Sequence, residues 1–353
     1  MKGLILSGGA GTRLRPITYN RAKQLVPVAN KPILFYGIEA IAAAGITEIG
    51  IIVGDTREEV SSAVGNGSRW GVQVTYIYQE EPLGLAHCVL IAREYLGEAP
   101  FVMYLGDNLI KSGINHFVEE FKTGGGNAQI LLAHVSNPSQ FGVAELEDGR
   151  VISLIEKPKE PKSDLALVGV YMFDPTIHEA VRAIKPSWRN ELEITDAIQY
   201  LIDHGYDVRP HIVNGWWKDT GKLEDILEAN RIILDSIDTN IETEPDGDTR
   251  LEGKVAIGKG TTITGSVIRG PAIIGCNCEI KNSFVGPFTA LQDGVRIINS
   301  EIENSIVCEQ SLISDAQQRI DGSLIGRDVV ISKSQARPKS YRFVVGDSSR
   351  LSL

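Results

Sequence analysis

The sequence has few cysteines, a short apolar start and no long apolar run. Only four of its 353 residues are cysteines, a content typical of proteins from a reducing compartment. Cys276 and Cys278 form a C-x-C pair, but no second Cys or His pair follows at zinc-site spacing, so we interpret them as small buried hydrophobic residues. The N-terminal apolar run reaches glycines too early for a signal peptide, and no stretch approaches the roughly 18 apolar residues of a membrane span. We therefore expect a cytoplasmic protein without a membrane partner.

Basic residues are also in the minority. The chain has 35 Lys and Arg against 45 Asp and Glu, which gives a formal net charge of -10. Binding to a nucleic-acid backbone needs a basic face, so this balance argues against nucleic acid as the main partner. A local basic pocket for a small phosphorylated substrate is still compatible with it.

Short apolar runs alternate with helix-period stretches through the first two-thirds of the chain. Residues 2–6, 48–53 and 101–105 are typical of buried strands, and residues 33–44 and 85–95 have a helical period. This alternation predicts an α/β fold with a Rossmann-like, mostly parallel sheet and helices on both faces.

A different pattern begins after the polar segment 238–250. Aliphatic residues then recur about every six positions, in sets of three that lie seventeen apart: Ile257, Ile274 and Leu291; Ile263, Ile280 and Ile297; Ile268, Val285 and Ile302. Such hexapeptide repeats are typical of a parallel β-helix, in which each coil buries its face by stacking on the next. We predict a first domain at 1–237, a linker at 238–250, and a β-helix domain with a C-terminal tail at 251–353.

The most informative segment is L-S-G-G-A-G-T-R-L-R-P at 6–16, just after the first strand. Glycines let the backbone approach phosphates and turn its N–H groups toward them. The segment is no Walker loop, which ends in Lys followed by Ser or Thr, and no dinucleotide fingerprint, because Leu14 stands at the third glycine. Arg13 and the later Lys23 are cations of the kind that stabilise phosphoryl transfer. Taken alone, the glycines fit a tight strand-to-helix turn equally well.

Carboxylates stand at three other strand ends. Asp107 closes an apolar strand, and Asp219 lies between a strand and a helix; two carboxylates with phosphate oxygens and water suit octahedral Mg²⁺. The alternatives are a turn aspartate and a helix-capping residue. Glu156 can accept hydrogen bonds from sugar hydroxyls and Lys157 can hold a phosphate, unless the two form a surface ion pair.

Together, these motifs resemble the sugar-1-phosphate nucleotidylyltransferase family, most closely its long-form glucose-1-phosphate thymidylyltransferases. The resemblance runs through essentially the whole chain and rests on the glycine-rich segment with K-Q-L at 23–25, G-L-A at 84–86, L-G-D-N at 105–108, I-E-K-P at 155–158, E-L-E-I-T-D at 191–196 and W-K-D-T-G at 217–221. It implies a left-handed β-helix and magnesium-dependent transfer of a thymidylyl group from dTTP to glucose 1-phosphate, with dTDP-glucose and pyrophosphate as products.

The resemblance also implies residue roles. The catalytic cations would be Arg13, Lys23 and Lys157, and the Mg²⁺ ligands would be Asp107 and Asp219. The nucleotide would contact Gly8, Gly9, Gly11, Thr12, Arg13, Gln24, Gln79, Gly84 and Asp107. The sugar phosphate would contact Asn108, Gly142, Glu156, Lys157, Val168 and Tyr171. A Gln amide can pair with the N3–H and a carbonyl of thymine or uracil, and Arg189 is a weaker phosphate candidate.

Two other interpretations remain open. The enzyme could use UTP or another sugar phosphate, or the chain could be a non-catalytic regulatory subunit. The presence of five charged site residues argues against a non-catalytic subunit: Arg13, Lys23, Asp107, Lys157 and Asp219. All six histidines precede residue 212, whereas hexapeptide acetyltransferases usually work with a His base, so we do not expect acyl transfer in the β-helix. We expect it to serve packing or assembly, and the protein to be a homo-oligomer.

Overall fold

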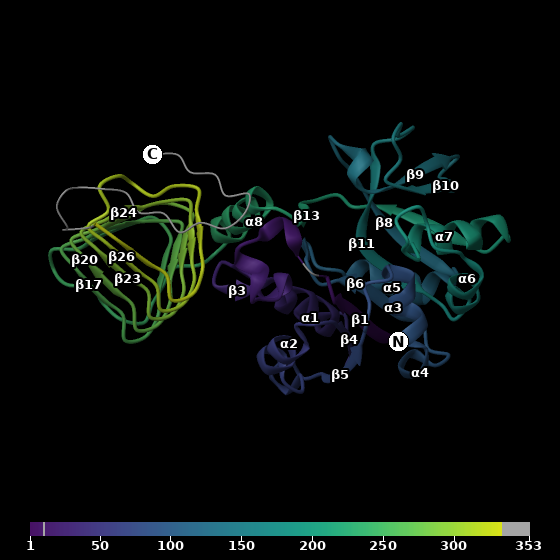
Figure 1. The fold of residues 1–353 in the computed structure, drawn as a ribbon, viewed down its shortest axis with the longest axis horizontal. Helices are drawn as coiled ribbons and strands as arrows, with labels where there is room; N and C mark the ends of the chain where they lie inside the picture. The colour runs from purple at the N-terminus through teal and green to yellow at the C-terminus, as the bar shows by residue number, and fades with distance from the viewer. Residues whose placement is uncertain (10, 334–353) are drawn as a thin grey trace. The chain divides into compact units, whose positions relative to one another are not determined.

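The computed structural model describes residues 1–9 and 11–333 (Figure 1). It divides the chain into two compact units. The first comprises Met1–Gly11, Arg21–Val26 and Pro32–Gly221, and the second comprises Thr12–Asn20, Pro27–Lys31 and the chain from Lys222 onward. The expected boundaries at 237 and 250 stay a prediction, and the tail from Arg337 lies outside the described residues.

In the described part of the first unit, nine strands form one sheet in the order β10-β9-β11-β6-β1-β4-β5, with β8 beside β11 and β12 beside β8. These strands are β1 (Lys2–Ser7), β4 (Glu48–Val53), β5 (Gln73–Tyr78), β6 (Phe101–Leu105), β8 (Ala128–His134), β9 (Gly142–Glu147), β10 (Arg150–Glu156), β11 (Leu165–Phe173) and β12 (Val208–Ile212). Strands β5, β4, β1 and β6 are mutually parallel, whereas β11 runs antiparallel to β6, β8 and β9. The sheet is therefore mixed, and the predicted α/β fold is confirmed.

Helices cover both faces of this sheet. They are α1 (Ile33–Ala43), α2 (Arg57–Val64), α3 (Leu85–Ile91), α4 (Arg93–Leu96), α5 (Asn115–Gly124), α6 (Ile177–Ala183) and α7 (Ile194–Asp203). Side chains alternate along a strand, and accordingly Leu4 and Leu6 of β1 pack into one core with α3, α4, α6 and α7. Ile5 packs into a second core with α1, α2 and α5. The central strands are thus buried on both sides, which leaves only their ends available for a site.

The second unit contains the stacked coils that the hexads predict. Its described strands form three parallel sheets, namely β14 (Asn240–Ile241), β16 (Val255–Ile257), β19 (Ala272–Ile274), β22 (Thr289–Leu291), β25 (Ile306–Val307) and β27 (Leu324–Ile325); β15 (Arg250–Glu252), β18 (Val267–Arg269), β21 (Phe284–Val285) and β24 (Glu301–Ile302); and β17 (Thr262–Thr264), β20 (Glu279–Lys281), β23 (Arg296–Ile298), β26 (Leu312–Ser314) and β28 (Val330–Ser332).

The predicted repeat positions pair with one another in register. Ile257 lies opposite Ile274, which lies opposite Leu291, and the other two sets stack in the same way. All nine side chains are buried in one core. This arrangement confirms the β-helix, and β14 within the expected linker also pairs with β16. Cys278 is buried as expected, whereas Cys276 is only partly buried.

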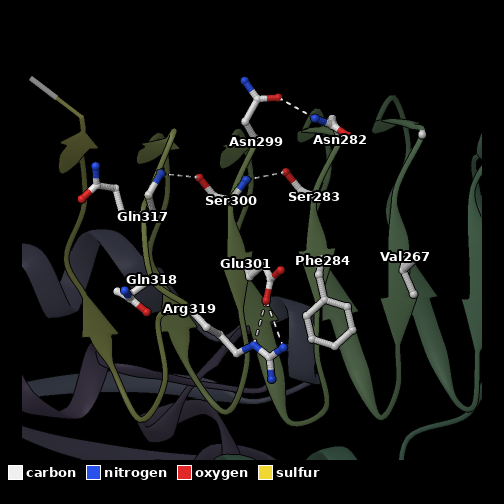
Figure 2. Close-up of a pocket in the computed structure, with 12 residues that line it drawn as sticks. Val267, Asn282, Ser283, Phe284, Asn299, Ser300, Glu301, Gln317, Gln318 and Arg319 are labelled. Atoms are coloured by element: carbon white, nitrogen blue, oxygen red, sulfur yellow. Dashed lines mark hydrogen bonds and ion pairs between the residues drawn. The ribbon is translucent and has the colours of Figure 1, made fainter. Parts of the chain in front are cut away.

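Polar side chains form ladders along one corner of the coils (Figure 2). Asn282 Nδ2 donates to Asn299 Oδ1 at 3.0 Å, and Ser300 N donates to Ser283 Oγ at 3.2 Å. Both asparagines have φ of 46°, a left-handed conformation that Asn tolerates better than most residues. The ladders flank a groove of about 710 Å³. These contacts help to fix how successive coils stack.

Helix α8 (Leu223–Asp235) is tied to the coils by one buried amide. Asn230 Oδ1 accepts from Ala29 N at 2.8 Å, and its Nδ2 donates to Phe288 O at 2.8 Å. Asn30 Nδ2 also donates to Leu291 O at 2.6 Å. These bonds explain why residues 27–31 and α8 group with the second unit. Among all the helices that the structure describes, none combines the length and the apolar character needed to cross a bilayer.

Because the interior of the coils is apolar, a charge placed inside it should destabilise the fold. Ile274→Asp buries a carboxylate with no partner at a position that is 1% exposed, so it should lower the free energy of unfolding by about 3 kcal/mol or more. Ile273→Asp is the matched control, because the neighbouring side chain is only partly buried. Urea unfolding followed by circular dichroism measures both. Equal losses in the two variants would contradict the buried-hexad account.

Candidate active site

A cavity of about 250 Å³ lies at the carboxyl ends of β1 and β6. Loops at such strand ends are where open α/β sheets bind ligands. The residues that line it are Leu6, Gly8, Gly9, Gln24, Gln79, Pro82, Gly84, Leu85, Cys88, Leu105, Asp107 and Glu191. Six of the predicted nucleotide contacts therefore share one cavity.

At two positions of this cavity, neighbouring atoms lie so close to the backbone that glycine is favoured. Gly84 has φ of 103°, and a Cβ there would lie 2.4 Å from the Leu192 carbonyl oxygen. A Cβ on Gly8 would lie 3.1 Å from Gln79 Oε1. Any side chain at Gly84 would thus collide with backbone, and one at Gly8 would press on the Gln79 amide.

The Gln79 amide is oriented by a histidine. Gln79 Nε2 lies 3.1 Å from His87 Nδ1 and 3.5 Å from the Gly84 carbonyl oxygen. Burial lowers the pKa of His87, with Glu81 acting in the opposite direction, which favours a neutral ring whose Nδ1 can accept from the amide. His87 is a site residue that no sequence motif indicated.

The two predicted metal ligands lie around one cation. Lys23 Nζ is 2.5 Å from Asp107 Oδ2 and 3.8 Å from Asp219 Oδ1. The short strand β13 (Trp217–Asp219) pairs antiparallel with β7 (Asn108–Ile110), and this register puts Asp219 opposite Asn108. The structure therefore brings Lys23, Asp107 and Asp219 together from three separate segments.

Neighbouring side chains hold Asp107 in place. Asn108 Nδ2 donates to Asp107 Oδ1 at 2.9 Å, and Trp217 Nε1 donates to Asn108 Oδ1 at 2.7 Å. Thr220 donates to the Asp107 carbonyl oxygen through N at 3.1 Å and through Oγ1 at 2.7 Å. A Cβ on Gly169 would lie 3.0 Å from Asn108 Oδ1, so the β11 backbone supports the same amide.

Electrostatics keep this aspartate charged. Burial alone would raise the pKa of Asp107, but the Lys23 ammonium and the hydrogen bonds from Lys23 and Asn108 outweigh it and hold the pKa below its usual range. These contacts thus favour the ionised carboxylate.

A second group of predicted residues surrounds Glu156. Its Oε1 lies 3.3 Å from Lys157 Nζ and 3.5 Å from Arg189 Nη1, and it pairs with Gly142 across β9 and β10. A Cβ on Gly142 would lie 3.2 Å from Glu156 Oε2. Burial raises the pKa of Glu156, with Lys157 opposing. Tyr171 is 3% exposed, and burial together with Glu156 raises its pKa.

Arg189 is surrounded by three carboxylates, and the sequence did not predict these ion pairs. Besides Glu156, it contacts Glu191 at 2.8 Å and Glu193 at 3.3 Å. Both glutamates belong to the E-L-E-I-T-D segment. The segment was recognised in the sequence, but its ion pairs with Arg189 were not predicted. Arg189 therefore orients Glu156 in this structure.

A chain of contacts joins the two groups. Lys157 N donates to the Phe141 carbonyl oxygen at 3.0 Å, and the Phe141 ring packs edge-on against Trp217 with centroids 5.7 Å apart. Trp217 in turn holds Asn108. Lys157 itself has φ of 44°, a conformation that is uncommon for a residue other than glycine.

The remaining predicted residues are placed as follows. Val168 is fully buried in the sheet core, and Gly11 has φ of 59°. Thr12 and Arg13 are exposed in the turn η1 (Thr12–Leu14) and group with the second unit. Their roles stay predictions.

Comparisons with known proteins agree with this geometry. A family model described as nucleotidyl transferase matches residues 2–236. A glucose-1-phosphate thymidylyltransferase of Streptomyces antibioticus is 58% identical, covering 100% of this chain and 99% of the relative. The low-salt glycan biosynthesis nucleotidyltransferase Agl11 of Haloferax volcanii is 47% identical over 100% of both chains. A solved UDP-glucose pyrophosphorylase with UDP-glucose has a TM-score of 0.60 at 25% identity, covering 67% of this chain and 99% of that one.

The lowered pKa of Asp107 predicts a pH-dependent contribution to stability. Its stabilisation is fully present above the unfolded-state pKa of about 3.9 and is lost as pH falls through the lower folded-state pKa. The gap in free energy of unfolding between wild type and Asp107→Asn should therefore narrow when the pH is lowered from about 6 to about 3. Calorimetric unfolding at each pH measures the gap. A gap that widens in acid would refute the assignment.

Proposed function

Because this chain belongs to the nucleotidyl transferase family, we propose that it transfers a thymidylyl group from dTTP to α-D-glucose 1-phosphate, giving dTDP-glucose and pyrophosphate. The observation that carries the proposal is the meeting of Lys23, Asp107 and Asp219. Asp107 also lines the cavity that the glycines and glutamines line. Full-length identity of 58% and 53% to glucose-1-phosphate thymidylyltransferases of two Streptomyces species supports the choice of substrates.

The reaction is a single displacement at phosphorus. A phosphate oxygen of glucose 1-phosphate attacks the α-phosphorus of dTTP in line, and the bond from that phosphorus to the bridging oxygen of pyrophosphate breaks. The nucleophile is already ionised at pH 7, so no general base and no covalent enzyme intermediate are needed. The protein's task is to hold two anions together against their repulsion, and Lys23 and Lys157 offset that charge. Arg13 is a third cation that the sequence motif alone assigns to this role.

The donor set at Asp107 and Asp219 fits Mg²⁺. Both carboxylates already lie around one cation, the Lys23 ammonium, and oxygen ligands are the ones that Mg²⁺ prefers. When bound, the ion supplies positive charge beside the phosphate oxygens of the nucleotide. With an ion held by Asp107 and Asp219, the Lys23 ammonium would share Asp107 with it and would be available to a phosphate.

The substrate contacts follow from the two residue groups. Gln24 and Gln79 would read the pyrimidine edge, with His87 fixing the Gln79 amide. Asn108, Gly142, Val168 and Tyr171 would line the sugar side, where Glu156 accepts from sugar hydroxyls and Lys157 holds the 1-phosphate.

Use of UTP is the nearest alternative, because a thymine and a uracil present the same Watson–Crick edge. A non-catalytic role is disfavoured by the convergence of Lys23 and both aspartates on one point. Homo-oligomer formation belongs to the proposal as well, since the sheet faces of the coils offer extended surfaces to a second copy.

Nucleotide selection tests the function directly. Pyrophosphate release over a matrix of nucleoside triphosphates and sugar 1-phosphates should be fast with dTTP and glucose 1-phosphate, measurable with UTP and negligible with ATP. A lost buried hydrogen-bond partner costs about 1–3 kcal/mol, or roughly fivefold to 150-fold in kcat/KM. Gln79→Leu should weaken pyrimidine selection. Efficient turnover with ATP would overturn the assignment of the base contacts.

The two aspartates should act as a unit. Asp107→Asn and Asp219→Asn should each lower kcat by about a hundredfold or more, and the double variant should lose little beyond that, because residues acting on one ion are not additive. Single-turnover kinetics at saturating substrate measure the losses. Losses that multiply in the double variant would indicate independent roles. Glu119→Gln, a substitution in an exposed ion pair with Lys122, serves as a control.

A further inference from the structure

We propose that His116, Glu120 and His211 form a binding site for a divalent transition-metal ion of the zinc class. The site belongs to the first unit and shares no residue with the Lys23, Asp107 and Asp219 group. The proposal does not depend on the function proposed above, since it rests on a separate cluster of side chains.

The three side chains already converge. One ligand atom from each lies within 4.8 Å of the others, and His211 Nδ1 is 3.0 Å from Glu120 Oε2. The rings of His116 and His211 meet edge-on with centroids 5.8 Å apart. Zinc bonds of about 2.0–2.1 Å in a tetrahedron separate ligand atoms by about 3.4 Å. The His211 and Glu120 atoms are near that separation, and a ligand atom of the exposed His116 lies within 4.8 Å of both residues.

Secondary structure explains the convergence. His116 and Glu120 are four residues apart on α5, so they share one face of the helix. His211 lies on β12, which pairs with β8. Strand β8 thus lies between β12 and β11. The Phe117 ring packs edge-on against His211 with centroids 4.7 Å apart. Because Phe117 is only 7% exposed, this contact limits the motion of the His211 ring.

A buried amide also contacts the Glu120 carboxylate. Gln129 is 2% exposed, and its Nε2 donates to Glu120 Oε2 and to the Phe117 carbonyl oxygen, both at 3.4 Å. Metal-binding carboxylates are usually held by such outer hydrogen bonds, which orient the ligand before the ion arrives. A solvated surface glutamate needs no such support.

The ligand set selects the class of ion. Two imidazoles and one carboxylate suit zinc and its first-row neighbours, whereas Mg²⁺ prefers oxygen ligands alone. A water molecule would complete four-coordination on the exposed side. Bound there, the ion would tie α5 to β12 and stabilise the folded state by mass action.

A second histidine provides the matched control. His134 Nδ1 lies 2.9 Å from Asp164 Oδ1, which is the same kind of His–carboxylate contact as that of His211. His134 is not part of the three-residue cluster. His134→Ala therefore removes a comparable surface contact and should leave metal binding unchanged.

The test uses the untagged full chain, stripped of metal by a chelator and kept in excess Mg²⁺. Titration with Zn²⁺ by calorimetry and with Co²⁺ by visible absorption should show one ion per chain, with the intense bands of low-coordinate Co²⁺. His134→Ala and Asp219→Asn should bind as wild type does. His116→Ala and His211→Ala should each weaken binding by about tenfold or more and lose the bands.

Two results would overturn the proposal. One is wild-type affinity in both His116→Ala and His211→Ala, and the other is the absence of one-equivalent binding in the wild type. Loss of the bands in Asp219→Asn alone would place the ion at the carboxylate pair instead. His116 is exposed, so its variant should fold, and far-ultraviolet circular dichroism checks this; His116→Gln repeats the test with a side chain of similar size.

Discussion

The contact between Lys23 and Asp107 is the interaction on which the rest of the site depends. A charged pair that is largely removed from water costs free energy unless each partner is held in place. Here the pair is held where several segments meet. These are the ends of β1 and β6, the turn that carries Lys23, and the short strand β13. Asp107 lines the same cavity as Gly8 and Gln79. One largely buried cation between two carboxylates thus links three separate segments of the first unit.

Support for this pair extends toward the opposite side of the site. Trp217 holds Asn108, which holds Asp107, and the Trp217 ring packs against Phe141, whose carbonyl oxygen accepts from Lys157 N. The two groups that would bind the nucleotide and the sugar phosphate are thus joined by rigid contacts. In-line transfer between two anions demands such fixed spacing, because the protein contributes position and charge and no covalent chemistry.

Local and periodic features were predictable from the sequence, and long-range pairings were not. The hexads that contain Ile257, Ile274 and Leu291 repeat along the chain, so the stacking of coils follows from the pattern alone. Gly8 and Asp107 were recognisable because each lies within two residues of the end of an apolar strand. By contrast, the contact of Gln79 with His87 depends on side-chain direction. The attachment of α8 through Asn230 joins segments about two hundred residues apart, for which no local pattern exists.

Binding of one ion by Asp107 and Asp219 can be measured directly in a crystal. A crystal structure with Mn²⁺ and a non-hydrolysable dTTP analogue locates the ion by its anomalous scattering. We predict an anomalous peak within bonding distance of both Asp107 and Asp219, with Lys23 Nζ moved from Asp107 toward a phosphate oxygen. A peak away from both aspartates, with Lys23 still 2.5 Å from Asp107, would contradict it.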